Sequence, residues 1–158
     1  MEVDPLNPLT PLFKDAFAHL AADLGESGTA ALLDSASLVD VEPGRRLITD
    51  RMPVDHLYFI VAGELRAYLE GPRRRIELGR AVAGQCLGEV SVLSGEKKAT
   101  ANVQAISACR LLRIHERRFV ELIAQHEVIA QVLLDHFIRE MAQRLRASQA
   151  ASLDLETP

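Results

Sequence analysis

One stretch of the sequence, Leu87-Gly-Glu-Val-Ser-Val-Leu-Ser-Gly-Glu-Lys-Lys-Ala-Thr100, combines the parts of a ligand-binding loop. Gly88 permits close approach of the backbone to a ligand because it has no Cβ. The carboxylate of Glu89 can accept hydrogen bonds from two neighbouring hydroxyls, and Lys98 supplies a cation. Residues 90–93 are expected to form one helical turn whose free N–H groups attract a phosphate. The stretch therefore predicts a site that holds a ribose on one side and a phosphate on the other.

Short segments with an alternating apolar pattern flank this stretch on both sides. They are separated by turn signals such as Glu42-Pro43-Gly44. We expect about eight short strands over residues 36–115, and their spacing indicates a small antiparallel β-barrel or jelly roll. The segments that we interpret as strands are 37–41, 46–49, 56–62, 64–70, 74–81, 100–105 and 108–114.

Helical patterns precede and follow the strands, so the predicted fold class is α+β. Residues 1–8 contain two prolines and are expected to be a loose N-terminal segment. Residues 9–35 predict two helices, the first with Thr10 as N-cap and with an end at Gly25. Residues 116–125 predict a short helix, residues 127–151 a long helix, and residues 152–158 a tail. We therefore expect one domain over residues 9–151.

The long helix carries two apolar stripes at helical spacing. One stripe could pack on the domain while the other meets a partner helix, or both could cover the domain's own core. We favour a homodimer through this helix because the first stripe continues a heptad pattern. The first stripe consists of Leu134, Ile138, Met141 and Leu145, and the second of Ile129, Leu133 and Phe137.

The order of these elements resembles the cyclic nucleotide-binding domain family over about residues 10–147. Further marks are Glu42-Pro-Gly-Arg-Arg46 before a strand, the segment Leu57-Tyr-Phe-Ile-Val-Ala-Gly-Glu-Leu65, and Gly84 ahead of Gly88. The chain looks like the sensor domain of bacterial regulators of the catabolite activator and fumarate-nitrate regulator type. We expect no DNA-binding domain, since few residues follow Leu145.

The resemblance implies a phosphate-binding cassette and a cyclic nucleotide ligand, either cyclic AMP or cyclic GMP. It implies that Glu89 binds the ribose 2′-hydroxyl and that Lys98 stands where the family usually has Arg. Because Lys cannot reproduce the bidentate fork of Arg, we expect weak binding. The long helix is expected to close over the base. The predicted ligand contacts are Gly88, Glu89, Val90, Ser91, Lys98, Ala99 and Thr100, and the predicted lid residues are Arg139, Met141 and Ala142.

Composition argues against several other classes of protein. A formal net charge of −4, from 18 basic and 22 acidic residues, does not favour a nucleic-acid partner, and Arg73-Arg74-Arg75 is expected to be a solvated turn. The sequence predicts no signal peptide and no membrane-spanning segment, so we expect a cytoplasmic protein. We expect no enzymatic activity, no metal and no cofactor. Cys86 and Cys109 lie far apart, and no His-x-His spacing occurs among His19, His56, His115, His126 and His136.

These patterns favour a stand-alone regulatory module that binds a cyclic nucleotide and signals through its C-terminal helix to an unidentified effector protein. One alternative is a degenerate domain that no longer binds nucleotide and acts as a protein-interaction or dimerisation module. A second alternative is a barrel enzyme or metal protein of the cupin kind, against which the sparse histidines argue.

Overall fold

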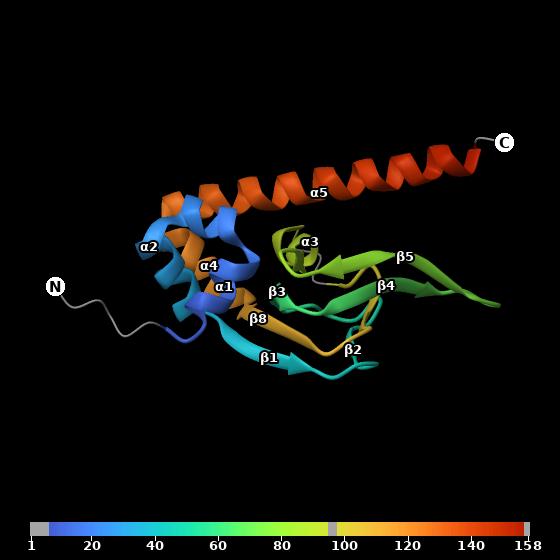
Figure 1. The fold of residues 1–158 in the computed structure, drawn as a ribbon, viewed down its shortest axis with the longest axis horizontal. Coiled ribbons are helices and arrows are strands. Elements are labelled where there is room, and N and C mark those ends of the chain that lie inside the picture. Colours follow the sequence, from blue (N-terminus) through green and yellow to red (C-terminus); the bar gives the residue numbers. More distant parts are fainter. Residues whose placement is uncertain (1–6, 95–97, 157–158) are drawn as a thin grey trace.

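The computed structural model describes residues 7–94 and 98–156 of the chain. These residues contain eight strands and five helices. The strands lie at one end, α1, α2 and α4 lie together at the other, and α5 runs along one side of both (Figure 1). The strands are β1 (Ser37–Val41), β2 (Arg46–Ile48), β3 (His56–Ala62), β4 (Glu64–Glu70), β5 (Arg75–Val82), β6 (Cys86–Leu87), β7 (Asn102–Ala105) and β8 (Cys109–His115). The helices are α1 (Thr10–Ala16), α2 (Ala18–Asp34), α3 (Glu89–Ser94), α4 (Glu116–Gln125) and α5 (Glu127–Glu156).

The strands form two antiparallel sheets of four strands each. Their orders are β1-β8-β3-β6 and β2-β7-β4-β5. Non-consecutive strands are therefore neighbours in both sheets, as in a jelly roll. The predicted α+β jelly roll with flanking helices is confirmed, with two facing sheets in place of one closed barrel. The predicted bounds of β1, β3 and β4 agree with those observed.

Two apolar clusters hold these layers together. Between the sheets lie alternate residues of several strands, such as Ile60, Leu65 and Leu111, all 0% exposed. The second cluster joins the helices to β3 through stacked and edge-on aromatic rings. The Phe17 ring lies 5.2 Å from that of Phe13 and 5.4 Å from that of Phe59. The helices are thereby fixed against β3, the strand that pairs with β6 at the start of the Leu87–Thr100 stretch.

Strand β6 was not among the predicted segments. It consists only of Cys86 and Leu87, and it pairs with β3 through Phe59↔Cys86 and Tyr58↔Leu87. Two residues are too few to show a period-two pattern, so only the tertiary pairing reveals this strand. The strand matters for function because it ends where Gly88 begins the predicted ligand loop.

The two N-terminal helices differ from the prediction in detail. Helix α1 begins at Thr10 with Leu9 as N-cap and without a side-chain cap, so the prediction of Thr10 as N-cap was wrong by one residue. Gly25 has φ 72° and ψ 178°, which no helix accommodates, yet a second helical segment follows at once. The predicted end at Gly25 is therefore a kink within α2, and the first predicted helix is instead interrupted at Phe17, between α1 and α2. Residues 1–6 of the predicted loose segment lie outside the described residues.

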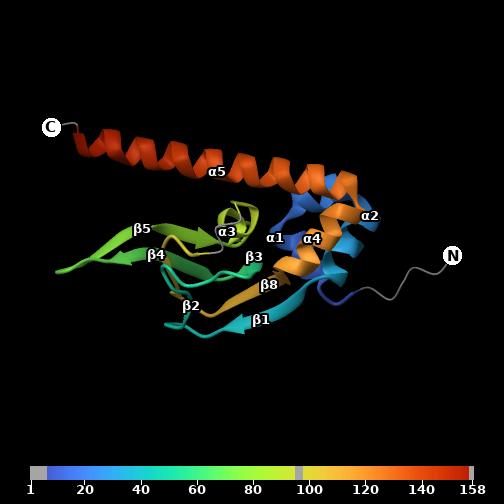
Figure 2. The same ribbon diagram turned by 180° about the vertical axis from the view of Figure 1, so that it is seen from behind.

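Helix α5 buries one of its two apolar stripes and exposes the other. Ile129, Leu133 and Phe137 are at most 4% exposed and pack on the helical end of the domain. In the other stripe Ile138 and Leu145 are each 60% exposed. The helix continues past the predicted end at Ala151 to Glu156. It extends beyond α1, α2 and α4 and runs along the side of the strands (Figure 2). Although α5 is long, neither it nor any other described helix carries an apolar run sufficient to cross a membrane.

Candidate functional site

The predicted loop begins at a backbone position that only glycine fits well. Gly88 has φ +84°, in the left-handed region that disfavours side chains, and a Cβ there would lie 2.5 Å from the carbonyl oxygen of His56. The backbone of the loop therefore packs directly on β3. Helix α3 follows, and the Val92 N–H donates to the Gly88 carbonyl at 3.0 Å. The predicted helical turn over 90–93 is thus part of a slightly longer helix, Glu89–Ser94.

Glu89 is buried, and α5 supplies its charged partner. Glu89 is only 2% exposed, and Arg144 Nη1 donates a hydrogen bond to Glu89 Oε1 at 3.1 Å. Arg144 Nη2 also donates to the Cys86 carbonyl at 2.7 Å and to Glu140 Oε1 at 3.2 Å. Burial raises the pKa of Glu89 above its ordinary value, and the Arg144 guanidinium opposes that rise. One arginine therefore joins the C-terminal helix to the start of the ligand loop.

Glu140 belongs to the same network. Its Oε1 accepts a hydrogen bond of 2.7 Å from the Cys86 N–H. Burial is the main cause that raises the pKa of Glu140 to about 7, and its backbone and arginine partners oppose the rise. Helix α5 is therefore held to β6 by two side chains one turn apart, Glu140 and Arg144.

A cavity of about 160 Å³ lies beside this network. Its apolar wall includes Ile48, Val54, Leu87 and Val103, and its polar groups come from Glu89, Ser91, Thr100 and Arg144. The volume is below the roughly 300–1,000 Å³ of ordinary small-molecule pockets. A ligand of ordinary size would therefore require some of the lining side chains, which include Arg144, to move.

Of the predicted ligand contacts that follow α3, two are among the described residues that line the cavity and one is not. Ala99 and Thr100 line the cavity, whereas Lys98 is exposed and is not among the described lining residues. The Ala99 N–H, which is the one hydrogen-bond donor that this residue could offer a ligand, already donates to the Met52 carbonyl at 2.9 Å. Ser91 Oγ donates to the Lys98 carbonyl at 3.1 Å, which joins both ends of the loop. The predicted contacts Gly88, Glu89 and Ser91 also line the cavity, and the side chain of Val90 is outside what the structure describes.

The predicted lid residues lie on α5 but not at the cavity. Arg139 is exposed and pairs with Asp135 at 3.1 Å, and Met141 and Ala142 are half-buried. None of the three is among the described residues that line the cavity, whereas Arg144 is. Sequence reasoning missed both Arg144 and Glu140. Their spacing of four residues, typical of an ion pair on one helix face, was the available signal.

The chain belongs to the cyclic nucleotide-binding domain family. The sequence profile of that family matches residues 38–126, which is more than half of the 158 residues. The match includes both sheets except for one residue of β1, the ligand loop and α4. The resemblance inferred from the sequence is thereby confirmed. A search of curated protein sequences found no match.

Solved structures of bacterial regulators share this fold. The N-terminal domain of a transcriptional regulator from Streptomyces coelicolor A3(2) is 26% identical, with a TM-score of 0.67 over 87% of this chain and 95% of that one. A cyclic nucleotide-binding domain from Methylobacillus flagellatus KT is 17% identical, with a TM-score of 0.80 over 95% and 87%. The catabolite activator protein of Thermus thermophilus is 22% identical, with a TM-score of 0.68 over 86% of this chain and 62% of that protein. The predicted likeness to such sensor domains is confirmed.

Proposed function

We propose that this protein is a regulatory module that binds cyclic AMP or cyclic GMP and signals through α5. The observation that carries the proposal is the buried carboxylate of Glu89, placed directly after Gly88 at a cavity within the segment that the family profile matches. A buried carboxylate that faces a cavity is an acceptor for ligand hydroxyl groups. We infer a cytoplasmic location, where such ligands are made, and an effector protein that is not identified.

In the proposed complex Glu89 accepts a hydrogen bond from the ribose 2′-hydroxyl. The first N–H groups of α3 and the Thr100 hydroxyl face the cyclic phosphate, and Lys98 reaches it from outside the present cavity. The apolar wall, with Ile48, Val54 and Val103, takes the purine base. These roles follow the family resemblance and suit the chemistry of the residues that line the cavity.

Arg144 links this site to α5 in the proposed mechanism. In the proposed complex the ribose hydroxyl competes with Arg144 for Glu89 Oε1, the oxygen that accepts at 3.1 Å and holds α5 to the loop. Release or rearrangement of Arg144 changes the free energy with which α5 packs against β6 and the loop. Helix α5 is then the two-state element that reports whether the site is occupied.

Lys98→Arg should tighten binding of cyclic AMP about ten- to a hundredfold. The arginine fork adds one charge-assisted hydrogen bond, which contributes about 1.5–3 kcal/mol. Fluorescence titration with a labelled cyclic AMP measures the change. Lys14→Arg, on the exposed surface of α1, is the matched control and should have no effect.

The degenerate interaction module remains the second candidate function. The ion pair between Glu89 and Arg144, the position of Lys98 outside the cavity lining and the occupied Ala99 N–H favour it. Failure of both the natural protein and the Lys98→Arg variant to bind at millimolar nucleotide would support this candidate and contradict the proposed sensor.

We also propose that the exposed stripe of α5 forms a homodimer. Leu134, Ile138 and Leu145 are 41%, 60% and 60% exposed, and they continue a heptad pattern along one face. Ile138→Asp should shift the protein from dimer to monomer, with self-association weakened at least about tenfold, because a two-fold interface would bury both new charges together. Sedimentation velocity over a range of concentrations measures this.

The matched control for the dimer is Val120→Asp on α4. Val120 is 56% exposed and lies outside the α5 stripe, so the same charge there should leave self-association unchanged. A natural protein that sediments as a monomer at all concentrations, or a Val120→Asp variant that dissociates as readily as Ile138→Asp, would contradict the proposed interface.

A further inference from the structure

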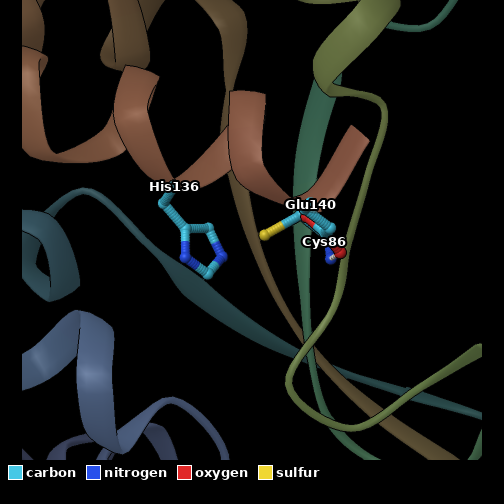
Figure 3. Close-up of side chains that lie close together, drawn as sticks. All are labelled: Cys86, His136 and Glu140. Carbon is cyan, nitrogen blue, oxygen red and sulfur yellow. Dashed lines mark hydrogen bonds between the residues drawn. The ribbon is translucent and has the colours of Figure 1, made fainter. Parts of the chain in front are cut away.

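Three side chains of the types that bind transition metals meet under α5. Cys86 comes from β6, and His136 and Glu140 lie one turn apart on α5, on a shared face. One sulfur, nitrogen or oxygen atom from each lies within 4.8 Å of the others. Figure 3 shows the Cys86 sulfur and the His136 ring facing one another, with Glu140 beside the cysteine. The proposed nucleotide site and the α5 stripe use neither the Cys86 thiol, the His136 ring nor Glu140 Oε2, although Glu140 Oε1 also accepts from Arg144.

Two atoms of the cluster are buried without a hydrogen-bond partner. Glu140 is only 6% exposed, and its Oε2 finds no partner among the residues that the structure describes. The same holds, within the described chain, for His136 Nε2. Buried polar atoms are almost always satisfied, since an unpaired one is destabilising. The Cys86 thiol interacts with the Glu140 carboxylate, and a species bound between the three side chains would give both unpaired atoms a partner.

We propose that Cys86, His136 and Glu140 bind one divalent transition-metal ion, with Zn²⁺ as the preferred ion. A thiolate, an imidazole and a carboxylate form a donor set that suits Zn²⁺ better than the oxygen-preferring Mg²⁺ or Ca²⁺. Zn²⁺ bonds of about 2.0–2.3 Å place tetrahedral ligands roughly 3.5 Å apart. Since the atoms lie within 4.8 Å of one another, these side chains have to approach by at most about 1.3 Å.

The surroundings are suited to such an ion. The Cys86 N–H and Arg144 both donate to Glu140 Oε1, which orients the carboxylate and leaves Oε2 for the metal. The thiolate and the carboxylate together balance the charge of a divalent cation. The ring of His136 packs at 6.1 Å from Phe17 and at 6.0 Å from Phe137, which limits its rotation. Three protein ligands leave a fourth position for water.

Cobalt titration of the chelator-treated, untagged full chain tests the proposal. We expect one equivalent of Co²⁺ to bind per chain, with a thiolate-to-cobalt charge-transfer band, and Zn²⁺ to displace it and raise the thermal midpoint. His136→Gln and Cys86→Ser should each weaken binding at least about tenfold, and Cys86→Ser should also abolish the band. If Cys86→Ser does not fold, His136→Gln alone tests the metal site. His136 is only half-buried, so this substitution should leave the fold intact.

Cys109→Ser is the matched control, since Cys109 is the other buried free thiol and lies in β8. It should bind Co²⁺ as the natural protein does. The proposal is overturned if no Co²⁺ binds at about a hundred micromolar. It is also overturned if the band is missing, or if His136→Gln binds as tightly as the natural protein. No nucleotide is present in this experiment, so its outcome does not depend on the proposed sensor function.

Discussion

Glu89→Gln should weaken the binding of cyclic AMP about ten- to a hundredfold. The glutamine keeps the shape of the side chain but replaces a charged acceptor by a neutral one, and a hydrogen bond to a charged group contributes about 1.5–3 kcal/mol. The variant should still fold, because a neutral amide is easily tolerated where burial already raises the pKa of the carboxyl. Isothermal titration calorimetry with cyclic AMP measures the affinity of both proteins.

A ligand that lacks the 2′-hydroxyl isolates the proposed contact. The natural protein should bind 2′-deoxy cyclic AMP about ten- to a hundredfold more weakly than cyclic AMP, and Glu89→Gln should discriminate much less between the two. Glu121→Gln, on the exposed surface of α4, should leave both affinities unchanged. Equal discrimination by the natural protein and by Glu89→Gln would remove Glu89 from the proposed ribose site.

Arg144→Ala should destabilise the fold, and the loss should grow as the pH rises. The change leaves the buried carboxylate of Glu89 without its cation, and an unsatisfied buried acceptor costs about 1–3 kcal/mol. The lower half of that range is expected, since the Arg144 side chain is 38% exposed and water already screens the pair. Urea unfolding of both proteins between pH 5 and 8 measures the difference in free energy of unfolding.

The sign of the pH dependence follows from the raised pKa of Glu89. Arg144 opposes that rise, so its removal moves the pKa of Glu89 further above its ordinary value of 4.5. A raised pKa gives stability that is present below the unfolded value and is lost as the pH rises through the folded one. Arg139→Ala, an exposed pair with Asp135 on the same helix, should cost at most about 0.5 kcal/mol at every pH. If Arg144→Ala lowers the free energy of unfolding by the same amount at pH 5 and at pH 8, this account is contradicted.

The fold could be predicted from the sequence wherever a local pattern was long enough. Strands β3 and β4 carry seven residues each with clear apolar or alternating character, and their predicted bounds are those observed. Helix α4 also has its predicted bounds, 116–125, because an apolar face follows a clear start. The two stripes of α5 were separated correctly by their helical spacing, and one of them is buried.

What the sequence did not reveal depends on contacts between distant segments. Strand β6 exists only through its pairing with β3, and the partner of Glu89 comes from α5, 55 residues further along the chain. The sequence contains no closely spaced histidines that would indicate a metal site. His136 and Glu140 are four residues apart on one helix, and Cys86 joins them only in the fold. Local spacing indicated the candidate ligand loop, but not the side chain of α5 that contacts it.

Calorimetric titration of the purified natural protein with cyclic AMP and with cyclic GMP tests the central claim most directly. The account predicts saturable one-to-one binding of at least one of them, weaker than in domains with arginine at the position of Lys98. The affinity of that ligand should fall about ten- to a hundredfold in Glu89→Gln. Absence of binding heat with either nucleotide up to millimolar concentration would contradict the account and favour the degenerate interaction module.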